Sequence, residues 1–361
     1  MTKVDIISGF LGAGKTTYIK ELINKVYEGE KLVLIENEFG EIGIDGGFLK
    51  DSGVEITEMN SGCICCTLVG DFTNALIEVL DTYKPDRVII EPSGVGKLSD
   101  VLGAVEAVKE RADIEIEGSV AVVDGKKAKM YLQNFGEFFE NQVQSASTIV
   151  VSRTQDIKPE KLEECIELLK SQNPEAAIIT TPWDELTKEA IINAYKGSKV
   201  SLMEDEHHHE HHDHHHEHHD HHEHDEGCGC GGHHHDHDHE CGCGGHHDHE
   251  HGEGCGCGEH HHEHGHDHHA DEVFTSWGQE TPHKYSEEEL IDILKALSGT
   301  KVYGTILRAK GIVPTIEGSW KQFDMVPEEY ELRDGSPDYT GRICVIGTDL
   351  KEDELKKAFH I

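Results

Sequence analysis

The stretch that decides the fold is Gly9-Phe-Leu-Gly-Ala-Gly-Lys-Thr16, close to the N-terminus. An apolar, strand-like run precedes it and an amphipathic helical pattern follows it, which is the context that a phosphate-binding loop requires. The glycines allow backbone N–H groups to converge on phosphates, the lysine reaches the β- and γ-phosphates, and the threonine hydroxyl ligates Mg²⁺. We therefore predict a nucleotide-binding loop whose contact residues are Gly9, Gly12, Gly14, Lys15, Thr16 and Thr17.

Around this loop, residues 1–203 alternate short apolar runs with helical patterns such as those at 17–27 and 160–169. Alternation of strands and helices favours a mainly parallel sheet covered by helices. We therefore predict an α/β fold of the P-loop NTPase class, in which Cys165 lies on a buried helix face. The predicted strands are residues 3–8, 31–36, 54–59, 87–91, 119–124, 147–152 and 176–181.

A second acid should help to hold the magnesium ion or to polarise the attacking water. Glu91 ends the apolar run Arg87-Val-Ile-Ile-Glu91, where a parallel sheet presents a carboxylate at the carboxyl end of a strand. Asp124, which ends another apolar run, is the alternative. Either carboxylate can also merely cap the next turn, and we favour Glu91.

The C-terminal region, residues 273–361, is predicted to form a small α+β domain. Ser286-x-x-Glu289 is a capping box that begins a helix ended by Gly299. Strand-like runs follow at residues 302–307, 312–316 and 342–346, with Cys344 buried in the last of them, and a short helix begins at Asp349.

Between these regions, residues 204–272 hold 29 of the 31 histidines, 21 carboxylates, six cysteines and no Lys or Arg. With almost no apolar side chains, this linker is expected to be disordered without metal. Three Cys-Gly-Cys units offer bidentate thiolate clips, and the surrounding imidazoles and carboxylates suit Zn²⁺, Ni²⁺ or Co²⁺. A solvated charge run does not explain the cysteines, and an internal, acid-rich tract is unlike an affinity tag. The predicted ligands are Cys228, Cys230, Cys241, Cys243, Cys255 and Cys257.

Charge and hydropathy exclude several functions. The chain has a net charge of −39, and the 292 residues outside the linker still carry −18. Such a surface repels nucleic acid and anionic membranes. No apolar run approaches the roughly 20 residues of a membrane span, and the N-terminus lacks the features of a signal peptide. We therefore expect a cytoplasmic protein, in which clustered cysteines act as metal ligands more often than as disulfides.

A second cysteine cluster, Cys63-Ile-Cys65-Cys66, lies in the first domain. Three thiolates on one loop can surround a tetrahedral ion and leave its fourth position open for exchange. Buried packing or a redox dithiol are the alternatives. We favour a metal site, because packing has no evident use for three adjacent sulfurs.

Five segments together resemble the CobW family of P-loop GTPases, which is related to the nickel-handling accessory GTPases of urease and hydrogenase. The resemblance covers both predicted domains, and His-rich inserts between them also occur in that family. It implies a cytosolic protein that couples GTP binding and hydrolysis to delivery of a transition metal to a client metalloprotein. The segments are residues 9–16, 36–45, 62–66, 91–94 and 308–311.

The resemblance also implies roles for individual residues. Lys15 and Thr16 serve the nucleotide and Mg²⁺, and Cys63, Cys65 and Cys66 hold the cargo metal. Glu38 and Glu41 belong to the segment that senses the γ-phosphate, so that Glu41 joins Lys15 and Glu91 among the catalytic candidates.

The chain departs from the family where Asn-Lys-x-Asp normally reads guanine. It has Ser152-Arg-Thr-Gln-Asp156 instead, in which Gln155 offers one carbonyl and a donor, and Asp156 comes one position late. Guanine selectivity is therefore in question. Arg153 can still lay its planar head or stem over the base, as the family lysine does.

The sequence thus favours a metallochaperone GTPase that uses GTP and Mg²⁺ and carries Zn²⁺ in preference to Ni²⁺ or Co²⁺, because thiolates are prominent at the cargo site. A metal store whose nucleotide domain only gates release is the main alternative. A small-molecule kinase is a third possibility, and it predicts no dependence on the cysteines.

Overall fold

The computed structural model describes residues 1–37, 55–58, 69–197 and 270–361. Residues Met1–Glu204 and Asp267–Ile361 group into one compact unit. Among the described residues, no helix is long and apolar enough to cross a membrane.

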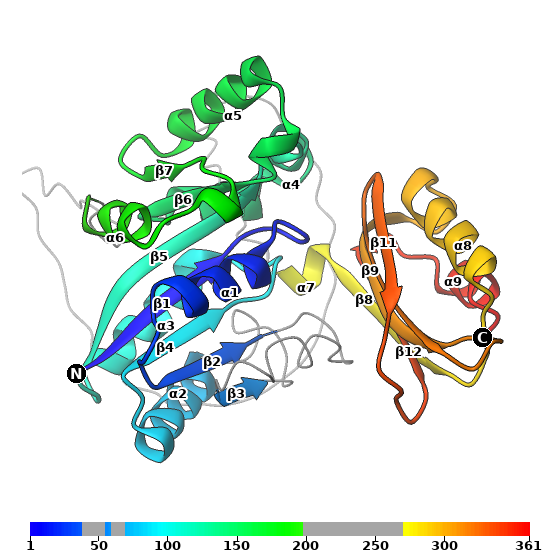
Figure 1. The fold of residues 1–361 in the computed structure, drawn as a ribbon, viewed down its shortest axis with the longest axis horizontal. Coiled ribbons are helices and arrows are strands. Elements are labelled where there is room, and N and C mark those ends of the chain that lie inside the picture. The colour runs from blue at the N-terminus through cyan, green and yellow to red at the C-terminus, as the bar shows by residue number, and fades with distance from the viewer. Residues whose placement is uncertain (38–54, 59–68, 198–269) are drawn as a thin grey trace, which may run out of the picture. The chain divides into compact units, whose positions relative to one another are not determined.

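The N-terminal part of the unit is built on a sheet of seven strands, all parallel, in the order β3-β2-β4-β1-β5-β6-β7 (Figure 1). All seven predicted strands are confirmed. The longest begins earlier than predicted, because its first residues alternate between buried and exposed positions and lack a continuous apolar run. The strands are β1 (Thr2–Ser8), β2 (Leu32–Glu36), β3 (Glu55–Glu58), β4 (Arg87–Glu91), β5 (Ile114–Asp124), β6 (Thr148–Ser152) and β7 (Ala177–Ile179).

Helices cover both faces of this sheet. Two helices bury apolar residues against one face, and four bury theirs against the other. The two-sided cover explains why strands such as β2 read as continuous apolar runs. The first group is α1 (Lys15–Lys25) and α6 (Lys188–Gly197), and the second is α2 (Val69–Tyr83), α3 (Leu98–Lys109), α4 (Ala128–Gln144) and α5 (Pro159–Gln172).

The C-terminal part begins with the short helix α7 (Ala270–Val273) and contains an antiparallel sheet in the order β11-β10-β9-β12-β8. The predicted helix is present as α8 (Glu287–Gly299), and Ser286 and Glu289 form the expected capping box. Apolar side chains of α8 and α9 (Glu352–Ala358) pack on this sheet. The strands are β8 (Thr275–Thr281), β9 (Thr305–Pro314), β10 (Trp320–Val326), β11 (Glu329–Asp334) and β12 (Gly341–Thr348).

One prediction for this sheet was wrong. Residues 302–307 and 312–316 were expected as two strands, but β9 runs unbroken from Thr305 to Pro314 and pairs with both β10 and β12. The polar interruption that suggested a break includes Lys310, which is buried. Gly311 is also needed inside the strand, because a Cβ there would approach the Phe323 ring to 2.5 Å.

Candidate nucleotide-binding site

The phosphate-binding loop connects the end of β1 to the start of α1, at the edge where the carboxyl ends of the parallel strands meet. Gly9 has no room for a side chain, because a Cβ there would lie 2.2 Å from the carbonyl oxygen of Val122. Gly14 caps α1 with a φ of 99°, a conformation that favours glycine. The Lys15 side chain is buried, and its ammonium donates a hydrogen bond to the Gly9 carbonyl at 3.0 Å. The loop is thus folded around the lysine that the sequence predicts as the phosphate ligand.

Glu91 lies beside this loop because β4 is the sheet neighbour of β1. The Thr16 hydroxyl donates to the two Glu91 carboxylate oxygens at 3.3 and 3.4 Å. The Lys15 ammonium is 4.0 Å from the same carboxylate. A hydroxyl and a carboxylate side by side are the hard oxygen donors that Mg²⁺ prefers, so the described residues fit a magnesium ion here. Asp124, the alternative acid, lies instead against Arg153 and the backbone N–H of Lys126.

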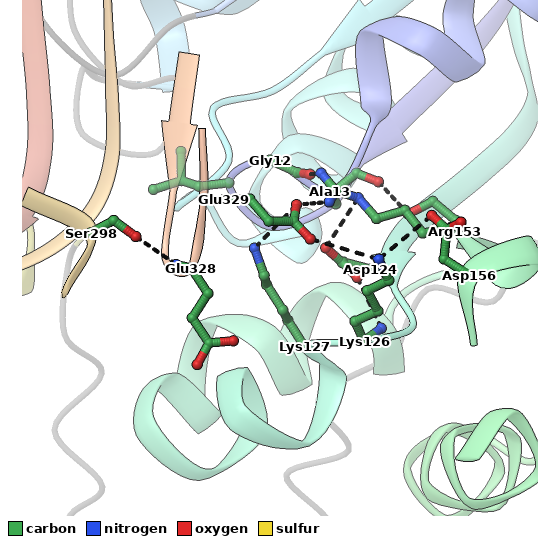
Figure 2. Close-up of polar contacts among 12 residues, drawn as sticks. Gly12, Ala13, Asp124, Lys126, Lys127, Arg153, Asp156, Ser298, Glu328 and Glu329 are labelled. Atoms are coloured by element: carbon green, nitrogen blue, oxygen red, sulfur yellow. Dashed lines mark hydrogen bonds and ion pairs between the residues drawn. The ribbon is translucent and has the colours of Figure 1, made fainter. Parts of the chain in front are cut away.

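The end of β6 is fixed to the phosphate-binding loop. The Ser152 hydroxyl donates to the Ala13 carbonyl at 2.7 Å. Arg153 follows in a left-handed conformation, with φ 61°, and its guanidinium lies 3.5 Å from the Gly12 carbonyl and 3.3 Å from the Asp124 carboxylate (Figure 2). Ser152 and Arg153, which replace the first two residues of the guanine-reading motif, are therefore held directly against the phosphate-binding loop.

The last two residues of the segment Ser152–Asp156 do not face the phosphate-binding loop. Gln155 and Asp156 are exposed on a short 3₁₀ helix, Thr154–Asp156. Asp156 lies 3.5 Å from the Lys126 ammonium. Neither residue lines the cavity described next.

A cavity of about 390 Å³ opens beside the phosphate-binding loop. One wall comes from the loop, α1, the end of β4 and Arg153, and it includes every predicted nucleotide residue except Gly9 and Gln155. The other wall comes from β9, β10 and β11, which the sequence did not predict as part of the site. Of these residues, only Arg308 could have been singled out from the sequence, because it begins the segment 308–311 that resembles the CobW family. The residues of this second wall are Arg308, Asp324, Val326, Glu329, Tyr330, Glu331 and Arg333.

Several predicted site residues lie outside the described residues, and their roles stay predictions. They are Glu38, Glu41, Cys63, Cys65, Cys66, Cys228, Cys230, Cys241, Cys243, Cys255 and Cys257. Within the part of the chain that the structure describes, no three His, Cys, Asp or Glu side chains gather in a group able to hold a metal ion. The two described cysteines, Cys165 and Cys344, are buried as predicted.

Comparison with known proteins finds relatives that are named as zinc chaperones and a similar solved structure. The zinc chaperone YeiR of Escherichia coli is 34% identical over 173 residues, which are 48% of this chain and 52% of YeiR. The zinc chaperone CobW of Sinorhizobium is 30% identical over 234 residues, or 57% of this chain and 66% of that protein. The chain thus spans between half and two thirds of these relatives. The crystal structure of Zn(II)-bound YjiA GTPase from E. coli covers 99% of this chain and 98% of its own, at 20% identity and a TM-score of 0.41.

Two family models match the chain, one in each part of the described unit. Residues 3–180 match the CobW/HypB/UreG nucleotide-binding domain. Residues 274–360 match the C-terminal domain of the cobalamin synthesis protein CobW. The first match contains the phosphate-binding loop, Glu91 and Arg153, and the second contains all five strands of the antiparallel sheet. The two matches together cover most of the sequence, and the chain is a member of the CobW family.

Proposed function

We propose that this protein is a GTP-hydrolysing metallochaperone that couples its nucleotide cycle to transfer of a transition metal, zinc in first place, to a client protein. The observation that carries the proposal is the phosphate-binding loop with Thr16 against Glu91, in a CobW-family chain that also holds the cysteine motif at residues 63–66. The relatives named as zinc chaperones support zinc.

The described residues suggest how the site would bind its substrate. Lys15 now donates to a neutral carbonyl and lies near one carboxylate, and a triphosphate is a stronger partner for a buried ammonium. Thr16 and Glu91 would hold Mg²⁺, which would neutralise charge on the phosphates. Glu91 would also help to orient the attacking water. Arg153 would pack over the base.

Metal enters this scheme as cargo. The thiols of Cys63, Cys65 and Cys66 would form a three-ligand site with one open position, so that the ion can be passed on. Residues 204–272 would supply ions to that site from a tethered reservoir.

The most direct test measures hydrolysis of GTP and of ATP with Zn²⁺, Ni²⁺ and Co²⁺ added separately. We expect GTP hydrolysis that Zn²⁺ stimulates more than the other two ions. Hydrolysis that responds to no metal would contradict the chaperone proposal, and a lack of any nucleotide hydrolysis would contradict the GTPase assignment as well.

Discrimination between GTP and ATP is expected to be weaker than in a GTPase with the full guanine motif. An Asp accepts from both guanine N1–H and N2–H, whereas Gln155 offers one uncharged carbonyl. Loss of one charge-assisted pair costs about 1.5 to 3 kcal/mol, or roughly ten- to over a hundredfold in affinity. Competition titration of the two nucleotides measures the ratio. A preference in the many thousands in the wild type would mean that another group reads guanine.

Metal storage remains a second candidate because the linker carries 29 histidines and six cysteines, far more ligands than one cargo ion needs. Storage predicts many ions per chain and hydrolysis that is indifferent to them. Metal stoichiometry measured beside metal-stimulated hydrolysis separates the two candidates.

The linker should release its ions on mild acidification. An unperturbed imidazole has a pKa of about 6.5, so that near pH 5 most of the 29 histidines become cationic and lose the ability to bind metal. We expect most histidine-bound metal to leave between about pH 7 and 5, while sites made of thiolates alone hold longer. Equilibrium dialysis with metal analysis checks this, and a flat profile down to pH 5 would argue against imidazole ligands.

A further inference from the structure

Arg153 is held at two ends by carboxylates from different parts of the chain. Its Nε lies 3.3 Å from Asp124, a buried residue at the end of β5. Its Nη1 forms an ion pair with Glu329, the first residue of β11 (Figure 2). The Arg153 side chain is only 30% exposed, and Nη2 lies 3.5 Å from the Gly12 carbonyl. The edges of the guanidinium are thus engaged by three acceptors.

Glu329 is itself fixed in place. It pairs with Val326 across the turn of the β10–β11 hairpin, and the N–H of Glu328 donates to the Ser298 hydroxyl at the end of α8 at 2.8 Å. Val326 packs against the phosphate-binding loop, since a Cβ added at Gly12 would meet its Cγ1 at 2.4 Å. The hairpin is therefore anchored on both sides, and it holds the backbone of Glu329 in a defined position.

Two lysines complete the surroundings of this carboxylate. The ammonium groups of Lys126 and Lys127 lie 3.8 and 3.7 Å from it (Figure 2). Burial lowers the pKa of Lys127 to about 8, an effect that the negative charge of Asp124 opposes. Glu329 therefore compensates a cluster of three cations next to the loop, which makes its pairing stronger than that of an exposed ion pair.

We infer that Glu329 is a positioning residue for base recognition, through which the C-terminal domain holds Arg153 ready to pack over the purine. The inference rests on the proposed function, because it takes a purine nucleotide as the ligand. Glu329 engages an edge of the guanidinium, whereas a base stacks on its face or along its stem, so both partners can be bound at once. A side chain that is already ordered loses less entropy when the nucleotide binds.

The test compares ligands with and without a base. Ordering one flexible side chain costs about 0.5–1.5 kcal/mol, so Glu329→Gln should weaken GTP and GDP binding by about two- to tenfold. Binding of inorganic tripolyphosphate, which has phosphates but no base, should not change. In an Arg153→Met background the same substitution should have no further effect on GTP affinity, because the residue through which Glu329 acts is gone.

Controls keep the outcomes distinct. Asp338→Asn breaks another arginine–carboxylate pair of the same domain, with Arg342, and should leave all three affinities unchanged. Thermal unfolding of each variant reports whether the fold is intact. Equal weakening of GTP and tripolyphosphate, unchanged GTP binding, or tighter GTP binding would each overturn the inference, the last because Glu329 would then compete with the nucleotide. A wild-type protein that binds no GTP would instead refute the proposed function.

Discussion

Lys15→Ala is expected to abolish tight GTP binding. Lys15 is the buried ammonium at the centre of the phosphate-binding loop, and in a bound triphosphate it would donate to two phosphates. Each lost charge-assisted hydrogen bond costs about 1.5–3 kcal/mol, so two together weaken binding by roughly a hundredfold to more than ten-thousandfold. Titration with a fluorescent GTP analogue measures the loss.

The control for this variant is Lys109→Ala, which removes an ammonium that pairs with Glu106 on the same helix, α3. Its GTP affinity should equal that of the wild type. Circular dichroism checks that Lys15→Ala still folds, since the substitution removes the ammonium that lies 4.0 Å from the Glu91 carboxylate. Full retention of GTP affinity in a folded Lys15→Ala protein would remove the phosphate-binding assignment.

The wall of the cavity that contains the phosphate-binding loop could be predicted, because short sequence motifs reveal it. The spacing of Gly9, Gly14 and Lys15 defines a loop between a strand and a helix, and strand–helix alternation implies a parallel sheet. In such a sheet the carboxyl ends of the strands share one edge, so a carboxylate that ends a strand, such as Glu91, is expected near the loop although it lies 75 residues from Thr16. The order of strands, helices and motifs along the chain was therefore enough to predict that Glu91 lies near the phosphate-binding loop.

The wall formed by β9, β10 and β11 could not be predicted, because no short motif connects these strands with the phosphate-binding loop. Glu329 and Arg153 are 176 residues apart, and nothing in the sequence around Glu329 distinguishes it from neighbouring acids. The strands β8, β10 and β11 were missed as well. β8 and β11 are polar and mainly exposed or partly buried, and the buried residues of β10 gather in its second half, so none of the three shows the alternation that reveals a strand. The same polarity inside β9 caused one strand to be predicted as two.

The prediction with the other large expected effect concerns the coupling of metal to hydrolysis. Residues 59–68, which contain Cys63, Cys65 and Cys66, connect β3 to α2. Because β3 is parallel to β2, its carboxyl end lies at the sheet edge where the phosphate-binding loop and Glu91 are found. Under the proposed function, an ion held by Cys63, Cys65 and Cys66 would couple to the groups that position phosphate and water.

Such coupling must be reciprocal in binding free energy: if nucleotide tightens the metal site, metal tightens nucleotide binding by the same factor, typically about 5- to 150-fold. Replacing Cys65 and Cys66 with Ser should abolish metal stimulation of hydrolysis at every metal concentration. Basal hydrolysis should remain, because Lys15, Thr16 and Glu91 are untouched. GTPase rates measured across a zinc titration give both quantities.

Deletion of residues 204–269, which keeps helix α7 (Ala270–Val273), should have the opposite pattern. A tethered reservoir raises the local supply of ions without belonging to the hydrolytic site, so its loss matters only when ions are scarce. The deleted protein should reach full stimulation at saturating zinc and should need more zinc to reach half of it. If the deletion removes stimulation and the cysteine variant keeps it, the cargo site lies in residues 204–272. Storage would then be the better account of the protein, because Cys63, Cys65 and Cys66 would have no part in loading.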